Sequence, residues 1–183
     1  KIIYPPTIQP VMKKNIPVWV KNTFEPDAAG TVIQQHAVSN NDIVRGISSI
    51  NKIALLSLEG SGMIGIPGFS KRLFEVLAMR NINVILITQS SSEYSICVAI
   101  NESDALLAQQ SIDAFFAYEI ENGKVNPVSV ETNLSIIAVV GEQMKSHAGI
   151  SGKRFGGLGR NGSNVRAIAQ GSSEKNISAV IAA

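Results

Sequence analysis

A short polar motif occurs twice in the chain: a glutamine, one further residue, two serines and a glutamate. The first copy lies in residues 87–96, ITQSSSEYSI, and the second in residues 168–177, IAQGSSEKNI. A side-chain amide both donates and accepts hydrogen bonds, so Gln89 and Gln170 can hold a hydroxyl, an ammonium group or a carboxylate. The alternative is that each glutamine bonds the backbone of its own turn. We favour ligand binding and expect two related small-molecule sites.

The repeat extends far beyond this motif at a constant offset of 81 residues, as between positions 87 and 168. A fixed offset over such a length indicates one supersecondary unit built twice. Polar residues repeat along with apolar ones, so packing alone does not explain the pattern. The further candidate site residues are Asn83, Val84, Gly65 and, in the second copy, Asn164, Val165 and Gly149. Asn83 and Asn164 could equally be turn formers.

Residues 60–65, GSGMIG, match the glycine pattern of dinucleotide-binding loops between a predicted strand and a predicted helix. That fingerprint also needs an acidic residue about 20 positions further on. The end of the next strand offers Gln89 instead, and the second repeat keeps only Gly141 of the three glycines. We therefore expect a loop whose backbone N–H groups face a small carboxylate at a helix N-terminus.

Composition excludes several classes of protein. The single cysteine, Cys97, rules out a disulfide framework and suggests a reducing compartment, the cytoplasm; we expect it to be buried and inert. His36 and His147 have no metal-ligand spacing, and no catalytic constellation is present, so we expect neither a metal nor a catalytic site. The net charge of +2 gives no electrostatic case for nucleic acid. No apolar run approaches the roughly 18 residues that a membrane helix needs.

The spacing of apolar residues predicts the elements of the first repeat. Strands are expected at 53–58, 84–88, 94–100 and 125–130, with helices at 67–80 and over about fifteen residues from Ser103. This β-α-β-β-α-β order predicts an α+β, ferredoxin-like unit: an antiparallel sheet with both helices on one face. The strand at 53–58 barely alternates, so both its faces should be covered.

The second repeat is incomplete. Strands are expected at 134–140, 165–169 and 177–182, with a helix near 149–160; the second helix and last strand are absent or come from elsewhere. Four glycines, Gly152, Gly156, Gly157 and Gly159, fall in the interior of that helix, and each costs about 1 kcal/mol relative to alanine. Arg154 takes the position of Leu73. We expect the helix to be short, frayed or held by tertiary contacts, with Arg154 reaching solvent.

The first 50 residues differ from the rest. Five of the seven prolines lie in residues 1–35, which argues against a long helix there; a short strand is expected at 17–21, followed by a loop at 22–30. Residues 36–50 are interpreted as a polar connector. The chain starts at Lys1 and stops within a strand-like run, so we expect a fragment of a larger protein.

Both copies resemble ACT domains, the amino-acid-sensing βαββαβ modules of biosynthetic enzymes. Residues 85–93 and 165–174 look like the paired regulatory domains of aspartokinase, in particular the threonine-sensitive form fused to homoserine dehydrogenase. Residues 3–33 resemble the tail of the kinase catalytic domain. The resemblance implies a kinase tail at 1–35, a connector at 36–50, a first ACT domain at 51–131 and a truncated second at 132–183.

The resemblance also implies a function. The parent enzyme would phosphorylate the side-chain carboxylate of aspartate with MgATP, be inhibited by an end product, most of all L-threonine, and dimerise through its ACT domains. Gln89 and Gln170 match the glutamines that contact threonine in that family. The kinase motifs are missing here, so we expect this chain to catalyse nothing and to bind no cofactor. Three alternatives stay open: a lysine-sensing aspartokinase, an oligomerisation module without a working site, and a nucleic-acid-binding sheet of the same topology.

Overall fold

The computed structural model describes residues 3–35, 44–91, 93–141, 149–171 and 176–182. The chain divides into two compact units, Lys1–Asp42 and Ile43–Ala183, and each is described by itself. No helix within the described ranges combines the length and the apolar character that crossing a membrane requires.

The first unit holds one helix and a two-stranded sheet. Helix α1 (Pro5–Lys13) begins with two prolines, which fit there because the first N–H groups of a helix have no partner inside it. Pro10 lies further in, so the density of prolines still permits a helix of nine residues. Strand β1 (Val18–Val20) pairs antiparallel with β2 (Thr31–Ile33). The short strand expected at 17–21 is confirmed, whereas β2 has no counterpart among the predicted strands.

The second unit contains a six-stranded antiparallel sheet in the order β4-β5-β3-β6-β8-β7. Its strands are β3 (Gly46–Glu59), β4 (Leu86–Gln89), β5 (Ser95–Asn101), β6 (Ser129–Val140), β7 (Val165–Gln170) and β8 (Asn176–Ala182). Its helices are α2 (Phe69–Met79), α3 (Ala105–Phe115), α4 (Ala117–Glu121) and α5 (Ile150–Arg160), with short 3₁₀ turns at Ser61–Met63 and Glu102–Asp104. The α+β class predicted for both repeats is confirmed.

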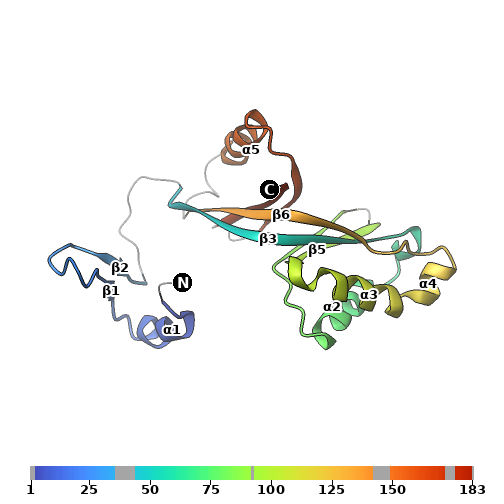
Figure 1. The fold of residues 1–183 in the computed structure, drawn as a ribbon, viewed down its shortest axis with the longest axis horizontal. Coiled ribbons are helices and arrows are strands. Elements are labelled where there is room, and N and C mark those ends of the chain that lie inside the picture. Colours follow the sequence, from blue (N-terminus) through green and yellow to red (C-terminus); the bar gives the residue numbers. More distant parts are fainter. Residues whose placement is uncertain (1–2, 36–43, 92, 142–148, 172–175, 183) are drawn as a thin grey trace. The chain divides into compact units, whose positions relative to one another are not determined.

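Strands β3 and β6 each serve two modules (Figure 1). The second half of β3 pairs with β5 and with the first half of β6, giving a first module in the order β4-β5-β3-β6. The first half of β3 pairs with the second half of β6, as in Gly46↔Val140, giving a second module in the order β7-β8-β6-β3. The missing last strand of the second repeat is therefore residues 46–50. These residues belong to a strand and not to the connector that we expected at 36–50.

The two modules meet at a pair of bulges. Lys52 and Asn133, which stand 81 residues apart, both have positive φ, 58° and 57°. The register between β3 and β6 shifts here, between Ile50 and Ile53 and again between Ile53 and Leu55. A bulge bends a strand without ending it. For this reason the strand expected at 134–140 continues back to Ser129, and of the strand expected at 125–130 only the last two residues belong to it.

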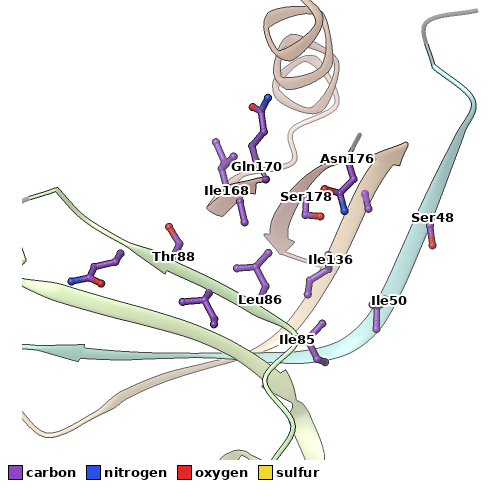
Figure 2. Close-up of a pocket in the computed structure, with 15 residues that line it drawn as sticks. Ser48, Ile50, Ile85, Leu86, Thr88, Ile136, Ile168, Gln170, Asn176 and Ser178 are labelled. Carbon is purple, nitrogen blue, oxygen red and sulfur yellow. The ribbon is translucent and has the colours of Figure 1, made fainter. Parts of the chain in front are cut away.

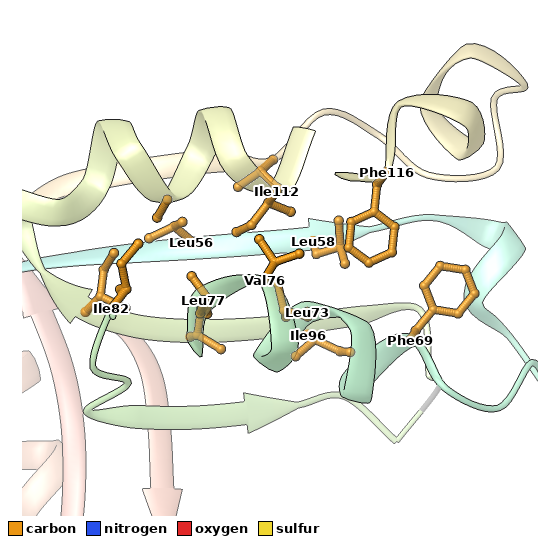
Figure 3. Close-up of a cluster of buried hydrophobic side chains, with 14 of the residues drawn as sticks. Leu56, Leu58, Phe69, Leu73, Val76, Leu77, Ile82, Ile96, Ile112 and Phe116 are labelled. Carbon is orange, nitrogen blue, oxygen red and sulfur yellow. The ribbon is translucent and has the colours of Figure 1, made fainter. Parts of the chain in front are cut away.

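The main core of the first module lies between the sheet and its helices (Figure 3). Helix α2 buries Phe69, Leu73, Val76 and Leu77, the face predicted from its apolar spacing. The second predicted helix is broken at Phe116, which separates α3 from α4. The ring of Phe116 is fully buried and stacks on that of Phe69, with ring centroids 5.9 Å apart.

The opposite face of β3 is also buried, as its lack of alternation predicts. Ile53 and Leu55 pack in a second apolar cluster with Leu134, Ile136 and other residues of the second module. Cys97, which we expected to be buried, is half-buried beside this cluster, with its Sγ 3.1 Å from the Ser57 Oγ. The two modules thus share a core as well as two strands.

An ion pair fixes α4 against α2. The Arg72 guanidinium lies 4.5 Å from the centroid of the Phe116 ring and donates a hydrogen bond to the Glu119 carboxylate. That hydrogen bond is the main reason why the pKa of Glu119 lies below its ordinary value, against an opposing effect of desolvation. The charged form of Glu119 is therefore the one that stabilises the fold.

The glycine-rich helix of the second module forms over Ile150–Arg160, as long as α2. The expectation that this helix is short is therefore wrong. The side chain of Arg154 lies outside the described residues, so its expected position in solvent stays a prediction. Among the described residues of α5, Phe155 is the one that packs on an apolar cluster, formed by Val139 and Ile177. Among the residues that the structure describes, the apolar cluster under the helix of the second module is thus much smaller than the main core of the first.

Candidate functional site

The two edge strands of the sheet, β4 and β7, contact each other. The first and last strands of one sheet can meet only if the sheet curls strongly. Between them lies a cavity of about 680 Å³, lined by residues of β3, β4, β6, β7 and β8 (Figure 2). This volume lies within the range of about 300–1,000 Å³ that is usual for small-molecule sites.

Both glutamines of the repeated motif line this cavity. Its floor is apolar, with Leu86 and Ile136 at the centre of Figure 2, while Gln170 extends from β7 toward α5. Within the described part of the chain, no protein group is hydrogen-bonded to the side-chain amide of Gln89 or Gln170. The turn that follows Gln170, residues 172–175, lies outside the described residues, so the alternative, in which each glutamine bonds the backbone of its own turn, stays beside ligand binding as a prediction.

A second cavity, of about 350 Å³, lies where the loop between β3 and α2 meets the hairpin between β4 and β5. It is lined by Gly65, Gly68, Ser70, Gln89 and Glu93, together with apolar residues of the loop and core. Gly65 and Gly68 have φ of 68° and 102°, which a residue with a side chain adopts only with strain. No side chain caps the N-terminus of α2, so the positive end of the helix dipole is directed at this space.

The first two glycines of the GSGMIG loop have a packing role. A Cβ at Gly60 would meet the backbone of Lys124 and Val125, and one at Gly62 would lie 2.9 Å from the Lys124 carbonyl oxygen. The Gly62 N–H donates to that same carbonyl at 2.9 Å. These glycines therefore let the loop approach the segment after α4, and do not need a bound phosphate to account for them.

The remaining candidates lie away from these two cavities. Asn83 is exposed before β4, and Val84 packs against the main core. The carbonyl of Asn164 accepts a hydrogen bond from Ala182, and Val165 pairs with Ile181. Gly149, at the start of α5, has φ of 88°, like its counterpart Gly68, but the loop before it lies outside the described residues.

Four polar residues of the larger cavity were not among the predicted site residues: Ser48, Thr88, Asn176 and Ser178. Thr88 stands beside Gln89 and could have been included with it. Asn176 and Ser178 belong to the neighbouring strand β8, and nothing local in their sequence marks them. His36 and His147 lie outside the described residues, and the described part of the chain holds no group of three potential metal-ligating side chains.

The fold and the two cavities define a class: a βαββαβ module and a second, related module with one described helix, which share strands and offer space for a small ligand. The family model for the ACT domain matches residues 56–116 and 137–183. The chain belongs to the ACT domain family.

Similarity to particular proteins extends over almost the whole chain. A bifunctional aspartokinase/homoserine dehydrogenase of Haemophilus influenzae is 41% identical over 181 residues, which are 99% of this chain and 22% of that protein. E. coli aspartokinase III, in complex with lysine and aspartate, has a TM-score of 0.76 at 28% identity. The match covers 100% of this chain and 39% of the E. coli chain. The regulatory subunit of aspartate kinase from Thermus flavus shares the fold, with a TM-score of 0.65 at 23% identity, over 77% of this chain and 90% of its own. The chain thus spans about a fifth of the bifunctional relative.

Proposed function

We propose that this chain is the effector-binding regulatory region of an aspartate kinase, and that it binds a free amino acid, threonine before others. The observation that carries the proposal is that Gln89 and Gln170, equivalent in the repeat, line one cavity and have no described protein partner for their amides. We infer the identity of the longer enzyme from the similar proteins, among them a bifunctional aspartokinase/homoserine dehydrogenase.

The chemistry of the site suits an amino acid with a polar side chain. In the smaller cavity, backbone N–H groups of the loop before α2 would receive the ligand's carboxylate, and Gln89, which lines both cavities, would bind its hydroxyl or ammonium group. A site that hydrogen-bonds a hydroxyl rejects ligands lacking it, because its own polar groups are then left unpaired. Threonine meets this requirement, whereas isoleucine, of similar shape, does not.

Inhibition requires that the effector prefer the inactive arrangement of the longer enzyme, since equal affinity for both arrangements shifts nothing. A coupling of about 1–3 kcal/mol between effector site and active site is typical. The kinase reaction itself, with MgATP and aspartate, would take place in parts of the longer protein outside this chain. We assign the protein to the cytoplasm, because one half-buried cysteine is compatible with a reducing compartment.

Self-association belongs to the same proposal. Strands β4 and β7 each have a neighbour on one side only, so their outer edges can pair with a second copy. Two copies packed side by side would bring the loop before α2 opposite a neighbouring module. An oligomerisation module without an effector site remains the second candidate, and lysine remains the second ligand because the E. coli relative is complexed with it.

Calorimetry with threonine, lysine, methionine and isoleucine tests the proposal directly. The chain should bind threonine, and Gln89→Ala or Gln170→Ala should weaken binding by about tenfold or more, the effect of losing one hydrogen bond near 1.4 kcal/mol. Gln110→Ala, an exposed glutamine of α3, is the matched control. Binding of lysine in preference would identify a lysine sensor. A folded chain that binds none of the four amino acids would favour the second candidate, an oligomerisation module without an effector site.

The longer enzyme provides the functional readout. Either alanine variant should raise the threonine concentration needed for half-inhibition while kinase turnover without threonine is retained. Inhibition that both variants leave unchanged would remove the proposed role of the glutamines.

A further inference from the structure

The side chain of Glu93 reaches the loop before α2, where we expect the ligand's carboxylate to bind. Its Oε2 accepts a hydrogen bond from the Gly65 N–H at 2.9 Å, across 28 positions of sequence. The neighbouring N–H groups of Ile64 and Ile66 are used inside the loop, donating to Ser61 and Met63. Of the N–H groups of Ile64, Gly65 and Ile66, that of Gly65 is therefore the one that bonds a residue outside the loop. That partner is the Glu93 carboxylate.

Glu93 is also held in an unusual place. It stands in the hairpin between β4 and β5 with φ of 58°, and its N–H donates to the Ser90 carbonyl, so the turn fixes its backbone. Its side chain is exposed at the cavity of about 350 Å³ that Gln89 and Ser70 also line. A flexible side chain on a fixed backbone can leave one partner for another without refolding the hairpin.

We propose that Glu93 selects α-amino acids by an exchange of partners, an inference that rests on the effector site proposed above. The carboxylate of the ligand takes the Gly65 N–H. The displaced Glu93 carboxylate then receives the ammonium group of the same ligand. Glu93 thus determines specificity, whereas Gln89 reads the side chain.

The charges explain the selectivity. A ligand with a carboxylate but no ammonium group must displace Glu93 and then lie beside it, so two negative charges share one small cavity. An α-amino acid replaces the hydrogen bond between the Glu93 carboxylate and the neutral Gly65 N–H with one to an ammonium group, in which donor and acceptor are both charged. The site should therefore reject hydroxy acids that have the same shape as its effector.

The test compares threonine with 3-hydroxybutyrate, which is threonine without its amino group. Calorimetry on the 183-residue chain gives the affinity ratio of the two ligands. In Glu93→Gln the preference for threonine should fall about tenfold or more, as expected when one charge-assisted hydrogen bond is lost. Glu93→Asp, which keeps the charge, should retain part of the preference. Glu121→Gln removes the same charge from an exposed position on α4 and should leave the ratio unchanged.

Each outcome separates the two proposals. If Glu93 were only a clip between hairpin and loop, Glu93→Gln would weaken both ligands in parallel and the ratio would stay the same, which overturns the exchange. A wild-type chain that binds neither ligand would instead refute the effector site itself. A ratio that collapses in Glu93→Gln and survives in Glu121→Gln supports the exchange.

Discussion

Replacing Gly62 by alanine tests whether the loop before α2 is held by its approach to Lys124. The added Cβ would lie 2.6 Å from the Lys124 Cβ and 2.9 Å from the Lys124 carbonyl oxygen, closer than carbon atoms of folded proteins come to such neighbours. The Lys124 backbone has little freedom to retreat, because its own N–H donates to the Glu119 carbonyl at 2.9 Å. The loop must therefore move away from it.

Three contributions set the magnitude. Forcing one extra methyl group into a packed contact costs about 1–3 kcal/mol. Stretching the hydrogen bond from the Gly62 N–H to the Lys124 carbonyl costs about 0.5–1.5 kcal/mol more. Alanine restricts the unfolded chain, which offsets about 0.4–1 kcal/mol. The free energy of unfolding should fall by about 2 kcal/mol, since the steric contribution is the largest of the three.

Urea unfolding followed by circular dichroism measures this change, and calorimetry with threonine measures its effect on the site. Gly46→Ala is the matched control, because nothing lies within 4 Å of a Cβ added there. We expect threonine affinity to fall with stability in Gly62→Ala, since the same loop carries Gly65. A Gly62→Ala variant as stable as Gly46→Ala would refute the packing role of this glycine. Lost stability with full threonine affinity would show that the loop's position does not set the site.

Two further predictions concern stability. Glu119→Gln should destabilise the chain at pH 7 and much less near pH 3. The pKa of Glu119 in the folded chain lies below its value of about 4.3 in the unfolded chain, so the ionised carboxylate stabilises the fold above that pH. This stabilisation is lost as the pH falls through the folded-state pKa. Urea midpoints of wild type and variant over that pH range should converge toward acid; a constant difference would contradict the role of the charge. Gly157→Ala, in α5 with open space around its Cβ, should stabilise the chain by about 0.5–1 kcal/mol. A thermal midpoint that does not rise would mean that α5 contributes nothing to cooperative unfolding.

Local patterns predicted the parts of the fold that local physics decides. The strands expected at 53–58, 84–88 and 94–100 and the helix expected at 67–80 all follow from apolar spacing over a few positions. The first half of β3 did not, because its partner Val140 lies more than 90 positions away and its residues are exposed. Its polar composition indicates a connector, and only the pairing with β6 makes it a strand.

The candidate site shows the same division. The repeated motif singled out Gln89 and Gln170 by type and spacing. That both line one cavity depends on the contact between β4 and β7, and hence on the curl of the whole sheet. The hydrogen bond between Glu93 and the Gly65 N–H was equally hidden, because a glutamate in a hairpin gives no local sign that it reaches a loop 28 positions earlier.

The shared strands give the two modules unequal roles. Among the described residues, the first module has three helices over a large core, whereas the second has one glycine-rich helix with a small apolar cluster beneath it. The second module therefore relies on what it shares: the first half of β3, and the cluster in which Leu134 and Ile136 pack against Ile53 and Leu55. Ile136 belongs to that cluster and also forms part of the cavity floor between the glutamines. A ligand in this cavity would thus contact the packing on which the weaker module depends, so its binding and the stability of that module should be linked.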